Sequence, residues 1–329
     1  MNNLSHINLK IQEVIIPDAM IIFPIFTPAR SKKDETVLID ELFGFKNIVI
    51  KGAHLNVGFH KKAYRHILKQ YQNGLRKSGW KNSGNTTIVI DEREMFSTLK
   101  IKNTDFPHYR KQFESLLEKL YKYEVDYTSP SGVPFHGRLI NTYSEAVDGV
   151  RTINLGDIFS DMLKSHSYAS TVNYVDDSIK VGVASELMEK LDIELRKISN
   201  TDTATVVVKA EYLLQSLQLA GKREKNIEKI TDALEYLKED IGFISKFEKV
   251  RTNKVQSFKV TFNKNFNLKK FKSSVQQVIA EKEVSGEVVS VTETGSRKPL
   301  IFGNLKAIQH DESKHDISGF DEEDDELPF

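Results

Sequence analysis

The alternation of apolar and polar positions predicts the same succession of elements twice along the chain. Each succession consists of a helix, a strand, a short helix, a long helix and a hairpin. The first long helix follows Asn103–Asp105, residue types that favour a helix N-terminus, and Pro107 is tolerated in its first turn. The first set of ranges is Gly58–Tyr71, Thr86–Ile90, Glu92–Leu99, a long helix carrying Tyr109, Phe113, Leu116, Leu117 and Leu120, and Tyr123–Tyr143 with a turn at Ser129–Gly132.

The second succession repeats this order further along the chain. Its ranges are Val181–Ile198, Ala204–Val208, Ala210–Leu217, Glu224–Glu239 after a turn at Gly221, and Phe243–Val250 with Val255–Phe262 around the turn Arg251–Lys254. Apolar positions correspond at an offset of 118 residues in the pairs Val89 and Val207, Met95 and Leu213, Leu99 and Leu217, and Ile101 and Leu219. In the long helices the offset is 117, which pairs Phe113 with Ile230, Leu117 with Leu234 and Leu120 with Leu237. A shared element order is difficult to obtain by chance. We therefore expect an α+β protein with two tandem winged-helix domains followed by a disordered acidic tail.

The remaining stretches set the expected domain boundaries. Ile11–Phe26 is rich in isoleucine but interrupted by Pro17 and Pro24, so we expect short extended pieces rather than a helix, packed on the first domain. Beyond about Glu281 the composition shows no sustained period. The expected parts are an extended N-terminal segment (1–45), a first winged-helix domain (46–165), a second winged-helix domain (170–280) and a disordered linker with an acidic tail (281–329).

Charge changes this picture by separating the body from the tail. The 329 residues carry a formal net charge of +1, but residues 311–329 contain nine acidic residues and one basic residue, Lys314. Residues 1–310 therefore carry a net charge of +9, which suggests an anionic polymer as partner. The chain contains no cysteine, which excludes disulfides and thiol catalysis. No apolar run reaches the roughly 18 residues that span a bilayer, so we expect a cytoplasmic protein without a membrane partner.

The two long helices carry the candidate DNA-binding residues. A winged helix places its second helix-turn-helix element in the major groove and its wing on the backbone or minor groove. The candidates in the first domain are His108, Arg110 and Lys111, beside the wing turn Ser129–Gly132. The second domain offers the denser set: Lys222, Arg223, Lys225, Asn226 and Lys229 on the helix, and Arg251 and Lys254 at the wing. Asn226 is of interest because asparagine can bind adenine through two hydrogen bonds, and the alternative for any of these residues is a solvated helix face.

Other chemistry is poorly supported by the sequence. Gly74–Lys81 resembles a phosphate-binding loop superficially, but Trp80 breaks the required core and no strand leads into it. The nine histidines form no metal-binding spacing, and acids such as Glu92 and Glu94 are common at helix starts. We therefore expect no enzyme activity, no metal and no cofactor.

The chain resembles the winged-helix replication initiators of bacterial plasmids, in particular the TrfA type. The resemblance covers roughly residues 20–265 and lies in the layout, in IFTPARSKK near the N-terminus and in VVVKAEYLLQSLQLAGKREKNIEKITDALEYL. It implies binding to double-stranded DNA at repeated origin sequences, opening of an adjacent AT-rich region and recruitment of host replication proteins without nucleotide hydrolysis.

The last nine residues, DEEDDELPF, resemble the tail of bacterial single-stranded-DNA-binding proteins, with Leu327 in place of isoleucine. The resemblance implies a docking peptide for host replication proteins that bind such tails. Phe329 would insert its ring into an apolar pocket, its carboxylate would meet a cationic side chain, and Pro328 would limit the freedom of the unbound peptide. Asp324, Asp325 and Glu326 would follow a basic rim. The alternative is an acidic segment that only increases solubility.

Two other functions remain open at this point. The chain could bind single-stranded DNA, with Trp80, Tyr109, Phe258 and Phe262 stacking on bases, although it lacks the dense short strands of an OB barrel. It could also be a winged-helix transcription regulator, which would share every feature of the body but has no use for the tail.

We predict that the tail docks proteins and is dispensable for duplex binding. Deleting Asp321–Phe329 removes six acids that repel phosphate, so affinity for duplex DNA should be unchanged or slightly higher at low salt. Phe329→Ala should abolish capture of host replication proteins by a tail peptide while keeping all six acids. Equal capture by wild-type, Phe329→Ala and C-terminally extended peptides would reduce the tail to a solubilising segment.

Overall fold

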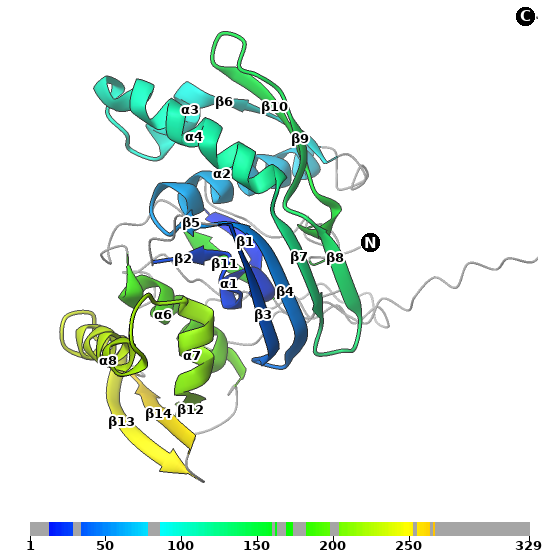
Figure 1. The fold of residues 1–329 in the computed structure, drawn as a ribbon. Coiled ribbons are helices and arrows are strands. Elements are labelled where there is room, and N and C mark those ends of the chain that lie inside the picture. The colour runs from blue at the N-terminus through cyan, green and yellow to red at the C-terminus, as the bar shows by residue number, and fades with distance from the viewer. Residues whose placement is uncertain are drawn as a thin grey trace, which may run out of the picture.

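The structure, a computed structural model, describes residues 13–28, 34–77, 86–159, 162, 169–173, 182–197, 204–252, 255–263 and 266. Helices combine with several small sheets, most of them antiparallel, so the α+β class is confirmed. Buried apolar side chains form two clusters, one running from Val14 to Val172 with Ile193 added, and the other from Leu187 to Phe262. In Figure 1 the second cluster belongs to the yellow-green and yellow elements at the lower left, and the first cluster belongs to the elements in the centre and above them.

The first predicted succession of elements is observed as far as its long helix, and we call these elements, together with two later strands, the first unit. It comprises α2 (Phe59–Lys77), β6 (Thr87–Asp91), α3 (Glu92–Thr98), α4 (Phe106–Tyr121), β9 (Ile140–Tyr143) and β10 (Val150–Leu155). Pro107 lies in the first turn of α4, where it costs no intrahelical hydrogen bond. The three strands form an antiparallel sheet in the order β6-β10-β9.

The predicted hairpin of the first unit is divided between two sheets. β7 (Glu124–Thr128) and β8 (Pro134–Arg138) pair around the predicted turn but extend β3 (Asp34–Leu42) and β4 (Phe45–Ala53) into a sheet of order β3-β4-β7-β8. The chain then changes sheets at the buried Leu139, whose carbonyl accepts from Gly156. A Cβ at position 156 would lie 1.6 Å from the Arg138 carbonyl oxygen, so only glycine permits this crossing. The prediction of one continuous strand from Phe135 to Tyr143 was therefore wrong.

The second unit follows its predicted order closely. It comprises α6 (Val183–Lys197), β12 (Thr205–Lys209), α7 (Ala210–Leu217), α8 (Arg223–Glu239), β13 (Ile244–Thr252) and β14 (Val255–Phe262), with sheet order β12-β14-β13. Corresponding positions share their burial: Met95 and Leu213 are buried in the two units, and so are Leu117 and Leu234. Val89 and Val207 are both exposed, at 64% and 61%. The repeat in the sequence is therefore also a repeat of burial.

The N-terminal segment fills the centre of the first cluster. β1 (Glu13–Pro17) pairs with β11 (Ala169–Asn173), and β2 (Phe26–Thr27) with β5 (Leu55–Asn56). The expectation of extended pieces alone was wrong, because α1 (Asp18–Ile22) forms one helical turn between the two prolines; Pro17 stands at its N-cap, where no helical hydrogen bond is lost. Because β3 pairs with β4 across residues 42–45, a division at residue 45 would cut through this ladder.

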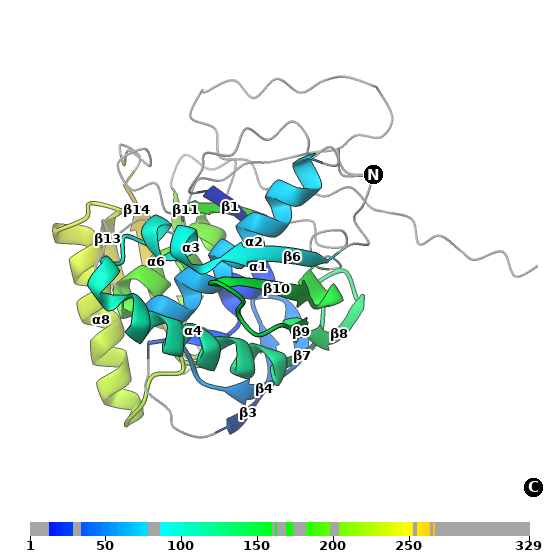
Figure 2. The ribbon, with the colours of Figure 1, turned by 90° about the horizontal axis from the view of Figure 1, so that it is seen from above.

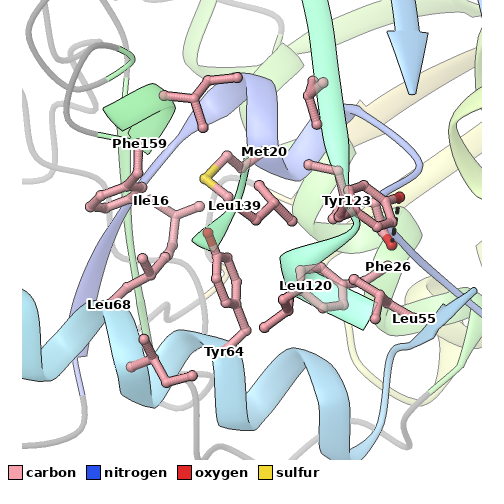
Figure 3. Packing of buried hydrophobic residues seen from close by; sticks show 14 of the residues in the cluster. Ile16, Met20, Phe26, Leu55, Tyr64, Leu68, Leu120, Tyr123, Leu139 and Phe159 are labelled. Atoms are coloured by element: carbon pink, nitrogen blue, oxygen red, sulfur yellow. Dashed lines mark hydrogen bonds between the residues drawn. The ribbon is translucent and has the colours of Figure 1, made fainter. Parts of the chain in front are cut away.

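Side chains from α2 hold the segment in place. The buried amide of Gln72 accepts from the Ile15 backbone nitrogen at 3.0 Å and donates to the Ile15 carbonyl oxygen at 2.8 Å. Figure 3 shows Ile16 and Met20 of the segment among Tyr64 and Leu68 of α2 and Leu120, Leu139 and Phe159. The Tyr123 hydroxyl, also in this view, donates to the Ile25 carbonyl at 3.4 Å. The buried segment is thus bound by backbone and side-chain hydrogen bonds as well as by packing.

Buried ion pairs join the two units. Arg65 of α2 donates from both terminal nitrogens to Glu189 of α6 at 2.9 and 2.8 Å, and Lys61 donates to Glu189 at 2.8 Å and to Glu186 at 2.5 Å. Burial alone would raise the pKa of Glu189, but the charges of Arg65 and Lys61 hold it well below its usual range. Burial lowers the pKa of the neighbouring Lys190 to about 8, and its ammonium donates to the Ile21 carbonyl of α1 at 2.5 Å. Charge complementarity thus fixes α2, α1 and α6 together.

We predict that Glu189→Gln destabilises the protein by about 3 to 5 kcal/mol, because it leaves the buried cations Lys61 and Arg65 under-compensated. The measurement is the free energy of unfolding in urea at pH 7. The control is Glu118→Gln, which breaks the exposed Glu118–Lys122 pair (2.9 Å) and should cost about 1 kcal/mol or less. Similar small losses in both variants would contradict the assigned role of the cluster.

His60 of α2 is held neutral inside the protein. Its Nδ1 accepts from the Asn56 backbone nitrogen at 3.3 Å, a bond that a protonated ring would lose. Burial, followed by the nearby charges of Lys119 and His54, lowers the pKa of His60 to about 4. Burial likewise lowers the pKa of His66 to about 4. Between pH 6.5 and 4 the unfolded chain therefore binds more protons than the folded protein at these two positions.

Stability should accordingly fall as the pH decreases from 6.5 to 4, because protonation favours the unfolded chain. His60→Gln keeps an acceptor but cannot titrate, so its loss of unfolding free energy between pH 7.5 and 5 should be smaller than that of the wild type by about 2 kcal/mol. Urea unfolding at the two pH values measures the difference. Parallel losses in the two proteins would show that His60 does not contribute.

Candidate nucleic-acid interface

The start of α8 is positioned by a tight turn after α7. Gln218 and Gly221 adopt positive φ angles of 45° and 114°, and Lys222 occupies the N-cap. Ile227, Ile230 and Leu234 face the second core, so the opposite side of the helix is exposed. The turn therefore presents the first residues of α8 at the surface of the second unit.

Asn226 has a structural position rather than the predicted exposed one. It is 5% exposed, and its amide nitrogen donates to the carbonyls of Leu219 at 2.8 Å and Gly221 at 3.4 Å. Since both bonds close the turn, this amide is not available to a base in the described conformation. The expectation that Asn226 contacts adenine is corrected on this ground; its place one turn into an amphipathic helix, next to Ile227, was the sequence signal for burial.

The other predicted residues of this helix are exposed. Arg223 lies toward the hairpin: its Nη1 donates to Gln256 Oε1 at 3.4 Å and its Nε lies 3.8 Å from Glu211. Lys229 lies toward the turn, where its ammonium donates to the Ala220 carbonyl at 3.3 Å. Lys222 and Lys225 are exposed at the same end. The structure thus brings together four of the five predicted residues of the helix.

The strand register extends this basic surface onto the hairpin. Arg251 lies opposite Gln256, and Lys249 lies opposite Phe258, so both cations share the face that carries the core residue Phe258. Gln256 in turn bonds Arg223, which connects the hairpin to the start of α8. Lys249 and Gln256 were missed by sequence reasoning, although the alternation Phe247, Lys249, Arg251 contains the signal. Lys254 lies outside the described residues.

Charge along α8 is distributed against the helix dipole. Residues 222–229 carry four cations (Lys222, Arg223, Lys225 and Lys229) and two acids (Glu224 and Glu228), whereas residues 230–240 carry four acids (Asp232, Glu235, Glu239 and Asp240) and one cation (Lys238). Acidic residues stabilise a helix N-terminus and basic residues stabilise its C-terminus, so this charge order lowers the stability of α8. Cations combined with the unpaired N–H groups of the first turn make the N-terminal end attractive to anions. A charge order that lowers local stability in this way is typical of a functional site.

The corresponding helix of the first unit has a different surface. Arg110 donates to the fully buried Glu92 at 2.8 Å, and Arg151 donates to the same carboxylate at 2.5 Å. Arg110 is therefore partly committed to neutralising a buried acid. His108 and Lys111 are exposed, and His108 contacts Gln112 at 2.6 Å.

The turn that we predicted as the wing of the first unit does not lie beside α4. Ser129–Gly132 connects β7 and β8, at the end of the molecule away from α4, whereas the loop 144–149 between β9 and β10 lies beside α4 (Figure 1). The cause is the change of sheets at Leu139, which sequence alternation does not reveal. A hollow of about 920 Å³ separates this loop from α4, and its charged lining consists of the acids Glu114, Glu118, Glu145 and Asp148 and the cations Arg93, Arg110 and Arg151. Arg110 and Arg151 are paired with Glu92, and Arg151 also with Glu114, so this surface offers less uncompensated positive charge than the start of α8.

Other predicted residues bear on the alternatives. Phe258 and Phe262 are buried in the second core and cannot stack on bases, and Tyr109 packs against Phe59. Trp80 and the tail residues Asp324, Asp325, Glu326, Leu327, Pro328 and Phe329 lie outside the described residues. Within the described residues, no group of three or more His, Asp or Glu is arranged to hold a metal. No helix there is both long and apolar enough to span a membrane.

Comparisons with known proteins identify no matching family model and no matching curated sequence. Among solved structures, the chain is similar to a crystal structure of domains 2 and 3 of RctB, determined from selenomethionine derivatives, with a TM-score of 0.44 and 12% sequence identity. The match covers 76% of this chain and 99% of that chain. A TM-score this low does not establish a shared fold, so the function must be inferred from the residues of this chain.

Proposed function

We propose that the second unit is a winged-helix domain that binds duplex DNA through the start of α8 and the hairpin β13–β14. The observation that carries the proposal is the Arg223–Gln256 contact, which joins two basic surfaces contributed by elements far apart in the sequence. In this arrangement the helix start approaches the major groove and the hairpin follows the adjacent backbone. Figure 2, a view from above, shows α8 and the hairpin on the same side of the molecule.

Charge supports this assignment. Lys222, Arg223, Lys249 and Arg251 surround the contact, and cations of this kind bind phosphates by displacing counterions. The acids in the second half of α8 would repel phosphate, so the duplex is approached by the N-terminal end of the helix rather than along its whole length.

The first unit has the same element order and is proposed as a second winged helix. It contributes less to DNA affinity, since Glu92 engages Arg110 and Arg151, two of the three arginines that line the hollow beside α4. His108 and Lys111 are the residues through which it would contact the backbone.

The cellular role we propose is replication initiation, with binding to repeated origin sequences, recruitment of host replication proteins through the tail and no catalysis. Its support is the sequence resemblance to plasmid initiators and the tail motif. A winged-helix transcription regulator would use the same interface. Single-strand binding is disfavoured by the burial of Phe258 and Phe262. Tandem repeats beside an AT-rich tract in the DNA flanking the gene would favour the initiator.

We predict that Lys249→Ala with Arg251→Ala weakens duplex binding and lowers the slope of log affinity against log salt by about 2, because two phosphates are no longer neutralised. The measurement is a salt titration with labelled duplex and the full chain. The matched control is Lys246→Ala with Lys259→Ala, which removes the same charge from the opposite face of the same sheet. Equal slopes for the two double variants would mean that only net charge matters and would contradict the proposed surface.

A further inference from the structure

Three exposed side chains in the first two turns of α8 have no partner within the described residues: Glu224, and Lys225 and Glu228, which lie nearest the middle of the outward face. Arg223 is engaged by Gln256 and Lys229 by the Ala220 carbonyl. Lys225 and Glu228 are exposed, and within the described part of the chain neither side chain has a hydrogen bond or an ion pair. They are three residues apart and therefore lie on one face of the helix, one turn after the other.

This face is the one directed away from the core. The buried residues Asn226, Ile227, Ile230 and Leu234 define the opposite side of α8, and helical geometry places Lys225 and Glu228 on the far side from them. Arg223, by contrast, lies on the side of Ile227 and Ile230, toward the hairpin, and Lys229 lies toward the turn. A helix that enters a groove by its N-terminal end brings its outward face to the base edges and its flanks to the phosphates.

The chemistry of Glu228 is informative because it is an acid in a basic surface. A carboxylate repels phosphate, so a contribution to DNA affinity has to come from donors on the bases. In the major groove, cytosine presents its N4 amino group as a donor and guanine presents the N7 and O6 acceptors. A carboxylate accepts from cytosine, and the ammonium of Lys225 donates to guanine.

We propose that Glu228 and Lys225 form the base-reading pair of the interface, with Glu228 accepting a hydrogen bond from cytosine N4 and Lys225 donating to a neighbouring guanine. This inference rests on the proposed duplex binding by the second unit and adds its sequence preference. Specificity is thereby separated from affinity: the flanking cations hold the backbone, and the outward face distinguishes the bases.

The test is a change of preference produced by Glu228→Gln in the full chain. Binding sites are first selected by the wild-type protein from a randomised duplex library, and each base pair of the selected site is then substituted in turn. Glu228→Gln should lose about tenfold discrimination at one cytosine and gain preference for adenine there, because a glutamine amide can both donate to and accept from adenine. Its salt slope and its melting temperature should stay close to those of the wild type.

The control is Glu235→Gln, the same chemical change in the acidic half of α8, where Glu235 contacts Lys238 at 3.0 Å. Its base preference should match that of the wild type. Duplex binding without any selected sequence, an unchanged preference in Glu228→Gln, or an equal change in Glu235→Gln would overturn this inference while leaving duplex binding intact. Absence of duplex binding by the wild-type chain would overturn the proposed function as well.

Discussion

The pairing of Arg65 and Lys61 with Glu189 is the constraint on which the arrangement of the two units depends. α2 is buried along most of its length, and the cations in its first two turns can be accommodated only if acids meet them there. α6 supplies those acids, and it also supplies Lys190, whose ammonium binds a carbonyl of α1. Arg196 of the same helix pairs with Asp18 at 2.9 Å. One helix of the second unit, α6, thus pairs with charged side chains of the first unit and donates to one of its carbonyls. These directional contacts fix a single orientation of the two units.

The two units show how one scaffold can carry different surfaces. Their cores correspond position by position, as Leu117 and Leu234 illustrate, and their helices and strands follow one order. The first unit directs Arg110 and Arg151 inward to Glu92, whereas the second keeps its basic residues at the surface. The two units therefore have corresponding core positions, but their charged residues differ in role: those of the first unit pair with a buried acid, and those of the second unit remain exposed.

Much of the second unit could be predicted from the sequence because its one hairpin, β13–β14, belongs to the same sheet as β12, although two helices separate β12 from that hairpin. Strands β13 and β14 are neighbours, and the amphipathic pattern of α8 defines its buried side. The first unit was harder, since β6 pairs with β10 across two helices and a hairpin that belongs to another sheet. The exposure of Asn226 was predicted wrongly because a polar residue can lie on the buried side of a helix when its side chain donates to carbonyls of a preceding turn. Lys249 needed the strand register before its face could be assigned.

The Gln72 amide that binds Ile15 has a consequence for the order of folding. β1 needs Gln72 on one side and β11 on the other, so its backbone is not satisfied until Asn173 has been synthesised. Contacts of such long sequence separation form slowly, and an apolar strand awaiting its partner is prone to pair with other chains. The nascent chain therefore carries an unpaired, isoleucine-rich strand from the synthesis of β1 until β11 has been made.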